Sequence, residues 1–286
     1  MTIVTSDDTD ATPALRRNNV RVSGTATGRP LIFAHGFGCS QEMWRLVAPA
    51  FESEHPVVLF DLVGSGGSDL SAYDAGKYDS LHGYADDVIE IAEELGLSDA
   101  VFVGHSVSSM IGVLAAIRRP DLFGALALVS PSPRYVDDGD YRGGFTQDDI
   151  DGLLDALDRN YLNWSATLAP QIMGNPDSPE LGDELTESFC RTDPQIARQF
   201  AQVTFLSDNR RDLAKVTVPT LVLQCSDDII APIEVGRHVH ENIAGSTFVQ
   251  LAATGHCPHL SAPQEVVAAL AGFVALPGPV GEPVSE

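Results

Sequence analysis

Ser106 stands in a setting that can turn a serine hydroxyl into a nucleophile. It lies in the middle of 104–108, Gly-His-Ser-Val-Ser, after the apolar run 100–103 and before the apolar segment 109–117, for which a buried helix is expected. A serine at a sharp strand-to-helix turn is a nucleophile elbow, in which only small neighbours avoid collision. The turn directs the helix N-terminus toward a developing oxyanion. A simple helix cap is the alternative interpretation of this serine.

The acid of a catalytic triad on such a turn must follow the serine and precede the histidine. The expected strand 220–224 leads into Asp227 and Asp228, and an acid at the carboxyl end of this late strand could orient an imidazole. We favour Asp228, four residues before Pro232, as this acid. Asp227 is then expected to be a solvated loop carboxylate.

The general base is expected to be His256, which follows a glycine in the loop before the last helix. His259 and His105 are the alternatives, and His105 is expected to pack beside the serine. The remaining histidines, including His238 and His240, show no metal-ligand spacing with acids or cysteines. No metal site is therefore predicted.

Backbone donors for an oxyanion are expected in the turn 35–38, His-Gly-Phe-Gly, directly after the expected strand 31–34. The flanking glycines leave N–H groups free to point into a site. We therefore expect the amides of Phe37 and Val107 to form an oxyanion hole. A tight turn without this role is the alternative, but the order turn, elbow, acid and histidine favours the functional interpretation.

Short apolar runs alternate with helical patterns along most of the chain. Continuous apolar runs are typical of parallel strands covered on both faces, so the alternation predicts a doubly wound, mostly parallel α/β sheet. Asp79 is expected to cap a helix with Leu81, Tyr84 and Val88 on its apolar face, ending at Gly96. The predicted strands are 20–24, 31–34, 57–61, 101–103, 125–129, 220–224 and 247–251.

The alternation stops between 131 and about 215, where helices are predicted near 147–159, 161–173, 179–191 and 194–207. An insertion after a strand would cover the place where open α/β sheets bind ligands. We therefore expect 131–215 to be a helical lid on a core of 14–130 and 216–275. Extra helices packed on one side are the alternative. The candidates for pocket wall or lid core are the aromatic residues Phe145, Tyr161, Trp164, Phe189, Phe200 and Phe205, of which Phe145, Trp164, Phe189 and Phe205 are assigned to the pocket.

Composition excludes several classes of protein. The 286 residues include 17 basic and 40 acidic side chains, a net charge of −23 that argues against binding nucleic acid or an anionic membrane. No apolar stretch is long enough to span a bilayer, and the first residues lack the pattern of a signal peptide. Four widely spaced cysteines indicate free thiols and a cytoplasmic location. Disordered tails are predicted at 1–13 and 276–286.

Over 14–275 the sequence resembles the α/β-hydrolase superfamily, and within it the subgroup of the stress regulator RsbQ and the plant karrikin and strigolactone receptors. The motifs that carry the resemblance are 34–38, 104–112, 228–232 and 255–259. Most of these hydrolases have G-x-S-x-G at the elbow, and Ser108 in place of the second glycine is what this subgroup shows. The resemblance implies a V-shaped lid of four helices over a hydrophobic pocket and the triad Ser106, Asp228 and His256.

The predicted function is that of a serine hydrolase acting on a small apolar ester, lactone or enol ether through an acyl-enzyme, without metal or organic cofactor. A serine nucleophile disfavours the dehalogenases and epoxide hydrolases of this fold, which use a carboxylate. The alternative is a signalling hydrolase whose reaction with a small hydrophobic ligand activates a partner. The resemblance to RsbQ implies a PAS-domain phosphatase as that partner.

Overall fold

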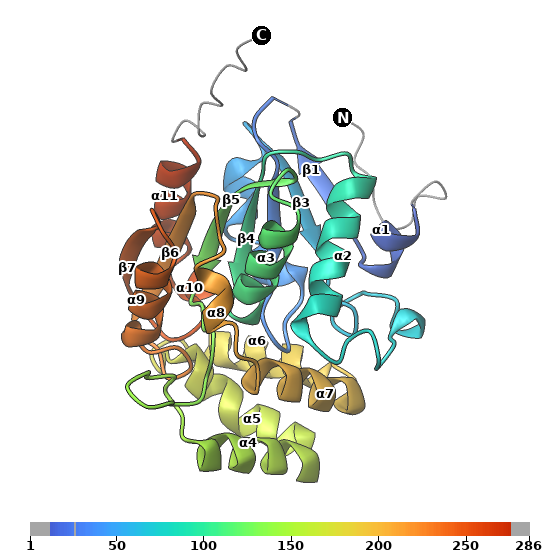
Figure 1. Cartoon of the computed structure of the whole chain (residues 1–286). Helices are drawn as coiled ribbons and strands as arrows, with labels where there is room; N and C mark the ends of the chain where they lie inside the picture. Colours follow the sequence, from blue (N-terminus) through green and yellow to red (C-terminus); the bar gives the residue numbers. More distant parts are fainter. Residues whose placement is uncertain (1–11, 26, 276–286) are drawn as a thin grey trace.

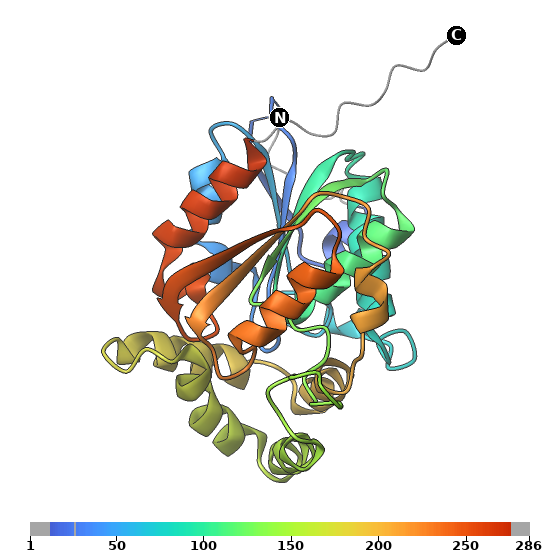
Figure 2. The same ribbon diagram turned by 60° about the vertical axis from the view of Figure 1, so that its left-hand side comes forward.

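The computed structural model describes residues 12–25 and 27–275, which form a seven-stranded sheet with helices on both faces (Figure 1, Figure 2). The strand order is β1-β3-β2-β4-β5-β6-β7. β1 is antiparallel to β3 and the other neighbouring pairs are parallel, as predicted. The strands are β1 (Arg21–Gly24), β2 (Leu31–Ala34), β3 (Pro56–Phe60), β4 (Ala100–His105), β5 (Phe123–Val129), β6 (Thr220–Asp227) and β7 (Thr247–Thr254).

The sheet separates two apolar layers, because successive side chains of a strand point to opposite faces. In β2, Ile32 lies in one layer and Phe33 in the other. The short apolar runs of the sequence are therefore strands buried on both faces. One layer is covered by α1 (Pro13–Arg17), α2 (Leu81–Glu94), α3 (Val107–Arg118), α8 (Arg210–Leu213) and α9 (Ile233–Asn242), and the other by η1 (Gln41–Trp44), η2 (Ala48–Phe51) and α11 (Pro263–Val274).

The predicted cap of α2 is wrong by one residue. Ser80, not Asp79, is the N-cap, and no side-chain hydrogen bond caps the helix. Aspartate and serine both suit this position, so local sequence could not choose between them. Gly96 follows the helix in the left-handed conformation, with φ of +62°, as its place after the apolar face predicts.

Four consecutive helices lie together at the end of the sheet where the parallel strands finish (Figure 1). Two hydrogen bonds tie them to loops after β2 and β7: Ser188 Oγ donates to the Gly38 carbonyl at 2.8 Å, and the His256 N–H donates to the Ile172 carbonyl at 2.9 Å. The helices are α4 (Gln147–Arg159), α5 (Tyr161–Met173), α6 (Pro179–Cys190) and α7 (Pro194–Phe205), within two residues of the predicted ranges. Shorter elements are η3 (Leu70–Ala72) and α10 (Pro258–Ser261).

The predicted tails fall almost wholly on residues outside the described part of the chain, 1–11 and 276–286. Within the described part, Pro13 is already the first residue of α1 rather than part of a tail. The four cysteines are free thiols, as predicted. Among the described residues, we find no helix that combines the length and the apolar character needed to cross a bilayer.

Candidate active site

Ser106 occupies a strained turn between β4 and α3. Its φ of +55° lies in the left-handed region, which costs free energy for a residue other than glycine. A Cβ on Gly104 would stand 2.5 Å from the Ser108 carbonyl oxygen, which explains why a side chain is excluded there. Although Ser106 is the N-cap residue of α3, its hydroxyl makes no capping hydrogen bond. The local geometry is that of a nucleophile elbow rather than of a simple cap.

A continuous hydrogen-bond chain connects the serine to a buried acid. Ser106 Oγ lies 2.7 Å from His256 Nε2, and His256 Nδ1 lies 2.7 Å from Asp228 Oδ2. The other carboxylate oxygen of Asp228 accepts the backbone N–H groups of Ile230 and Ala231, at 2.9 and 3.0 Å. These amides fix the carboxylate, so the imidazole carries its proton on Nδ1 and turns the lone pair of Nε2 toward the serine.

The alternative acid, Asp227, and the alternative bases, His105 and His259, are not part of this hydrogen-bond chain. Asp227 is exposed, and its carbonyl accepts the Gly255 N–H at 2.7 Å. His105 donates from Nε2 to the His256 carbonyl at 2.8 Å. His259 stacks on Trp44 with ring centroids 4.6 Å apart. Burial holds the pKa of His105 well below its ordinary value and lowers that of His259 to about 3, so both rings are neutral at pH 7.

The turn predicted to supply oxyanion donors lies close to the serine. A Cβ on Gly36 would stand 2.6 Å from His105 Nδ1 and 3.3 Å from Ser106 Cβ, so the residues of the elbow leave no room for a side chain at this position. Phe37 and Ser106 line the same cavity. Val107 is the first residue of α3, where backbone N–H groups have no partner within the helix. The two residues predicted to supply the donors, Phe37 and Val107, therefore lie near Ser106.

Ser108 ties the elbow to this turn. Its side chain is fully buried, and Ser108 Oγ donates to the His35 carbonyl at 2.5 Å. His35 Nε2 accepts the Leu62 N–H at 3.0 Å, which leaves the proton on Nδ1 to bond the Gly36 carbonyl at 2.8 Å. A glycine at 108 could not make the first bond. The departure from G-x-S-x-G thus places a hydrogen bond between α3 and the turn before Phe37.

The cavity beside Ser106 is small and mainly apolar, with a volume of about 30 Å³. Of the aromatic residues assigned to the pocket, Phe189 and Phe205 line it, whereas Phe145 and Trp164 do not. Trp164 stacks behind Phe189, with ring centroids 5.8 Å apart. The residues that line the cavity are Phe37, Cys39, His105, Ser106, Tyr135, Ile172, Leu185, Phe189, Thr204, Phe205, Ile230, His256 and Cys257.

Tyr135 and Thr204 are wall residues that the sequence analysis missed. Tyr135 lies in an irregular segment after β5, where no periodic pattern assigns a side chain to a face. Thr204 is a small polar residue beside the more obvious Phe205. A hydroxyl-bearing residue on the apolar face of a helix was the one available signal for Thr204.

Comparison with known proteins assigns the family. Residues 31–270 match the model of the alpha/beta hydrolase family. The chain belongs to the α/β hydrolase family. Relatives of this α/β hydrolase include a karrikin insensitive 2 receptor from Petunia hybrida, 39% identical over 88% of this chain and 94% of the relative. A strigolactone esterase from Arabidopsis thaliana is 40% identical over 87% of this chain and 92% of its own length.

Solved structures agree with the assignment. A hydrolase from Oleispira antarctica is 39% identical and superposes with a TM-score of 0.89 over 96% of this chain and 98% of its own. An esterase from Exiguobacterium antarcticum, 22% identical over 90% of this chain and 96% of its own, shares the fold with a TM-score of 0.82. The family and the relatives named esterase or hydrolase make this α/β hydrolase a hydrolytic enzyme.

In this α/β hydrolase the ring of Phe37 is surrounded by aromatic rings of the helices α5, α6 and α7. The ring centroids lie 6.1 Å from Trp164, 5.7 Å from Phe189, 5.5 Å from Phe200 and 6.1 Å from Phe205. Aromatic pairs at such distances are stabilising. A shift of these helices would therefore disturb Phe37, which lines the same cavity as Ser106.

One group among residues 12–25 and 27–275 brings three potential metal ligands together: His105, Cys257 and His259, whose ligand atoms lie within 4.8 Å of one another. All three are buried. The His105 ring is tied to the His256 carbonyl, and the His259 ring stacks on Trp44. We assign this group to packing behind His256.

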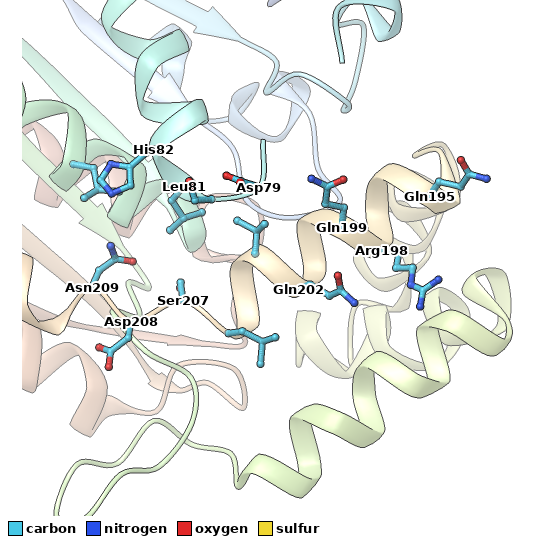
Figure 3. A pocket seen from close by; sticks show the side chains of 14 residues that line it. Asp79, Leu81, His82, Gln195, Arg198, Gln199, Gln202, Ser207, Asp208 and Asn209 are labelled. Carbon is cyan, nitrogen blue, oxygen red and sulfur yellow. The ribbon is translucent and has the colours of Figure 1, made fainter. Parts of the chain in front are cut away.

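A more spacious groove of about 730 Å³ lies between the start of α2 and α7 (Figure 3). Most of its lining residues have polar side chains, among them Asp79, His82, Gln199 and Gln202, and leucine and valine side chains complete the wall. It contains neither Ser106 nor any residue hydrogen-bonded to it. We place the candidate active site in the smaller cavity, because Ser106 lines that cavity and does not line the groove.

Proposed function

We propose that the protein is a serine hydrolase that cleaves a small, largely apolar ester, lactone or enol ether. One observation carries this proposal: the hydrogen-bond chain from Ser106 through His256 to Asp228 opens onto an apolar cavity. Esters and lactones are neutral, so they lose little hydration energy in such a cavity compared with a charged substrate. The net charge of −23 also disfavours an anionic substrate.

For an ester or lactone, or for an enol ether that also carries such a carbonyl, the proposed reaction proceeds through an acyl-enzyme. His256 Nε2 accepts the proton of Ser106 Oγ as the oxygen attacks the acyl carbon, and the amides of Phe37 and Val107 stabilise the oxyanion. When the tetrahedral intermediate collapses, the imidazolium protonates the departing alcohol or enol oxygen. A water molecule, deprotonated by His256, then attacks the acyl carbon and releases the acid.

We further propose that 131–215 is a lid on a core of 14–130 and 216–275. The cavity is small and is lined by side chains of α5, α6 and α7, so movement of these helices or rearrangement of their side chains would control substrate entry. The bonds from Ser188 to Gly38 and from His256 to Ile172 join these helices to the catalytic loops. Lid movement and active-site order would therefore be coupled.

The test is a Ser106→Ala variant assayed with p-nitrophenyl acetate and with a serine-directed fluorophosphonate. Alanine is smaller than serine and fits the elbow, so the variant should fold normally. Activity should fall about 10³-fold or more, leaving what the oxyanion donors and binding supply. The fluorophosphonate adduct should map to Ser106 and be absent from the variant. Full activity in a folded Ser106→Ala protein would refute the triad.

A second candidate function is signalling, in which hydrolysis of a small hydrophobic ligand changes the lid and activates a partner such as a PAS-domain phosphatase. Two observations favour it: the identity of about 39% to proteins named karrikin insensitive 2 receptors, and the rings of three helices around Phe37. Turnover distinguishes the two functions. A metabolic esterase releases many products per molecule, whereas a signalling hydrolase is expected to pause after one or a few cycles.

A further inference from the structure

The wall of the active-site cavity carries two hydroxyl groups besides that of Ser106. They belong to Tyr135 and Thr204, whose side chains are each 1% exposed. Thr204 lies on α7 beside Phe205, and the Phe205 ring lies 5.1 Å from the ring of Tyr135 and 6.1 Å from that of Phe37. The threonine is therefore part of the wall that faces the catalytic turn.

The two hydroxyls differ in their partners. Burial raises the pKa of Tyr135 to about 12, although interaction with the Ser106 hydroxyl acts in the opposite direction. Tyr135 is thus a protonated neighbour of the nucleophile at neutral pH. Thr204 Oγ1 is buried and has no hydrogen-bond partner among the residues that the structure describes.

Other hydroxyls in the neighbouring helices behave differently. Ser165, Thr167 and Thr186 each donate to the backbone carbonyl four residues earlier, at 2.8 to 2.9 Å. This local bond is the ordinary way in which a helical serine or threonine satisfies its hydroxyl. Thr204 does not make this bond, so its hydroxyl donor has no partner on its own helix.

An unused buried donor costs stability, and a valine of the same shape would avoid that cost. The residues that line the cavity include no aspartate, glutamate, lysine or arginine, so an ionised ligand group would find no opposite charge. A neutral oxygen in the ligand could accept the hydrogen bond and remove the cost. Such an oxygen would have to be separate from the scissile carbonyl, whose oxygen the backbone amides receive.

We infer that Thr204 is a specificity-determining residue that donates a hydrogen bond to a second, neutral oxygen of the substrate. The preferred substrates are then esters or lactones that carry an additional ether or carbonyl oxygen. This inference rests on the proposed serine hydrolase function.

The test is a Thr204→Val variant, with Thr204→Ser as the control that keeps a hydroxyl. Each protein is assayed with two ester pairs that differ only in an oxygen replacing a methylene: p-nitrophenyl methoxyacetate with p-nitrophenyl butyrate, and methoxyethyl acetate with butyl acetate. The ratio of kcat/KM within a pair cancels intrinsic reactivity when two enzymes are compared. In at least one pair, Thr204→Val should lower the preference for the oxygenated ester about three- to tenfold. Thr204→Ser should retain it.

A change of preference smaller than threefold in both pairs overturns the inference. An equal loss of kcat/KM for the oxygenated ester and for its methylene counterpart would indicate a purely structural role of Thr204 and would also overturn the inference. Thermal unfolding gives an independent readout, since removal of the unpaired hydroxyl should leave Tm equal or raised, and a lower Tm contradicts an unused donor. Failure of the proposed function is distinguishable, because Ser106→Ala would then still hydrolyse these esters.

Discussion

At the scale of single residues, the active site depends on which of two adjacent aspartates is buried. Asp228 is 4% exposed and divides its two oxygens between the imidazole and two backbone amides. Asp227 is exposed and contributes its backbone carbonyl. Two chemically identical neighbours thus have different environments, and only one can hold the tautomer of His256.

We expect Asp228→Asn to lower kcat by roughly 10²–10⁴, because an amide next to Nδ1 favours the wrong tautomer of His256. The matched variant Asp227→Asn should change kcat less than about threefold, since an exposed carboxylate makes no bond to the imidazole. Steady-state assays with p-nitrophenyl acetate and a circular dichroism check of folding measure both. The reverse ranking would show that Asp227 is the acid.

At the scale of elements, the site is assembled by contacts between the helix α3, the turn after β2 and the loop after β7. Gly255 in that last loop has φ of +80°, and a Cβ there would stand 1.8 Å from the Met173 carbonyl oxygen. The next residue, His256, donates its N–H to Ile172. The approach of α5 to the loop that contains His256 therefore requires a glycine.

Gly255→Ala should destabilise the protein by more than Gly245→Ala and should also reduce esterase activity. Gly245 has φ of +71° but nothing within 4 Å of its added Cβ, so it reports the cost of the backbone conformation alone, about 1 kcal/mol. Urea unfolding and kcat/KM of both variants provide the comparison. Equal free energies of unfolding would mean that the contact with α5 is unimportant.

The bond from Ser108 to the His35 carbonyl predicts a second effect at this scale. Ser108→Gly restores the more common G-x-S-x-G pattern but removes the tie between α3 and the turn before Phe37. We expect kcat to fall about tenfold with little change in KM, because the oxyanion donors become less well positioned. As a control, Thr186→Ala removes a hydroxyl that bonds within its own helix. A variant Ser108→Gly with unchanged kcat would argue against positioning by this bond.

At the scale of the whole molecule, the interior contains imidazoles that are neutral in the folded state. Burial lowers the pKa of His35, of His105 and, to about 3, of His259. The unfolded chain takes up protons on these residues below about pH 6.5, whereas the folded protein does not. Stability contributed by these groups is therefore present above that pH and is lost as the pH falls.

Unfolding free energy should decline with falling pH by up to about 1.4 kcal/mol per pH unit for each such histidine. Between pH 6.5 and pH 5, His259 alone accounts for a loss of about 2 kcal/mol. The variant His259→Phe keeps a ring against Trp44 and removes this proton uptake, so its stability should fall less steeply over the same interval. Urea unfolding at a series of pH values measures the slope, and identical slopes for the two proteins would contradict the assignment.

Local patterns in the sequence determined the order of elements and the positions of the motifs. The strands buried on both faces appear as short apolar runs, and the helices α4 and α5 begin and end where their patterns and caps place them. Three motifs directly follow the ends of strands, where residues no longer pair with a neighbouring strand: the elbow, the turn at 35–38 and the loop with His256. These features are determined by residues close to one another in the chain, so a single sequence is enough to predict them.

Only the tertiary structure decided which side chains meet. Asp228 and His256 are 28 residues apart, and His256 and Ser106 are 150 apart, so their hydrogen bonds depend on strand order and register. The same packing determines that Thr204 and Tyr135 line the cavity and that Phe145 and Trp164 do not. Amphipathic helices show which face is apolar but not which apolar residue meets a cavity, because that depends on how several helices pack against one another.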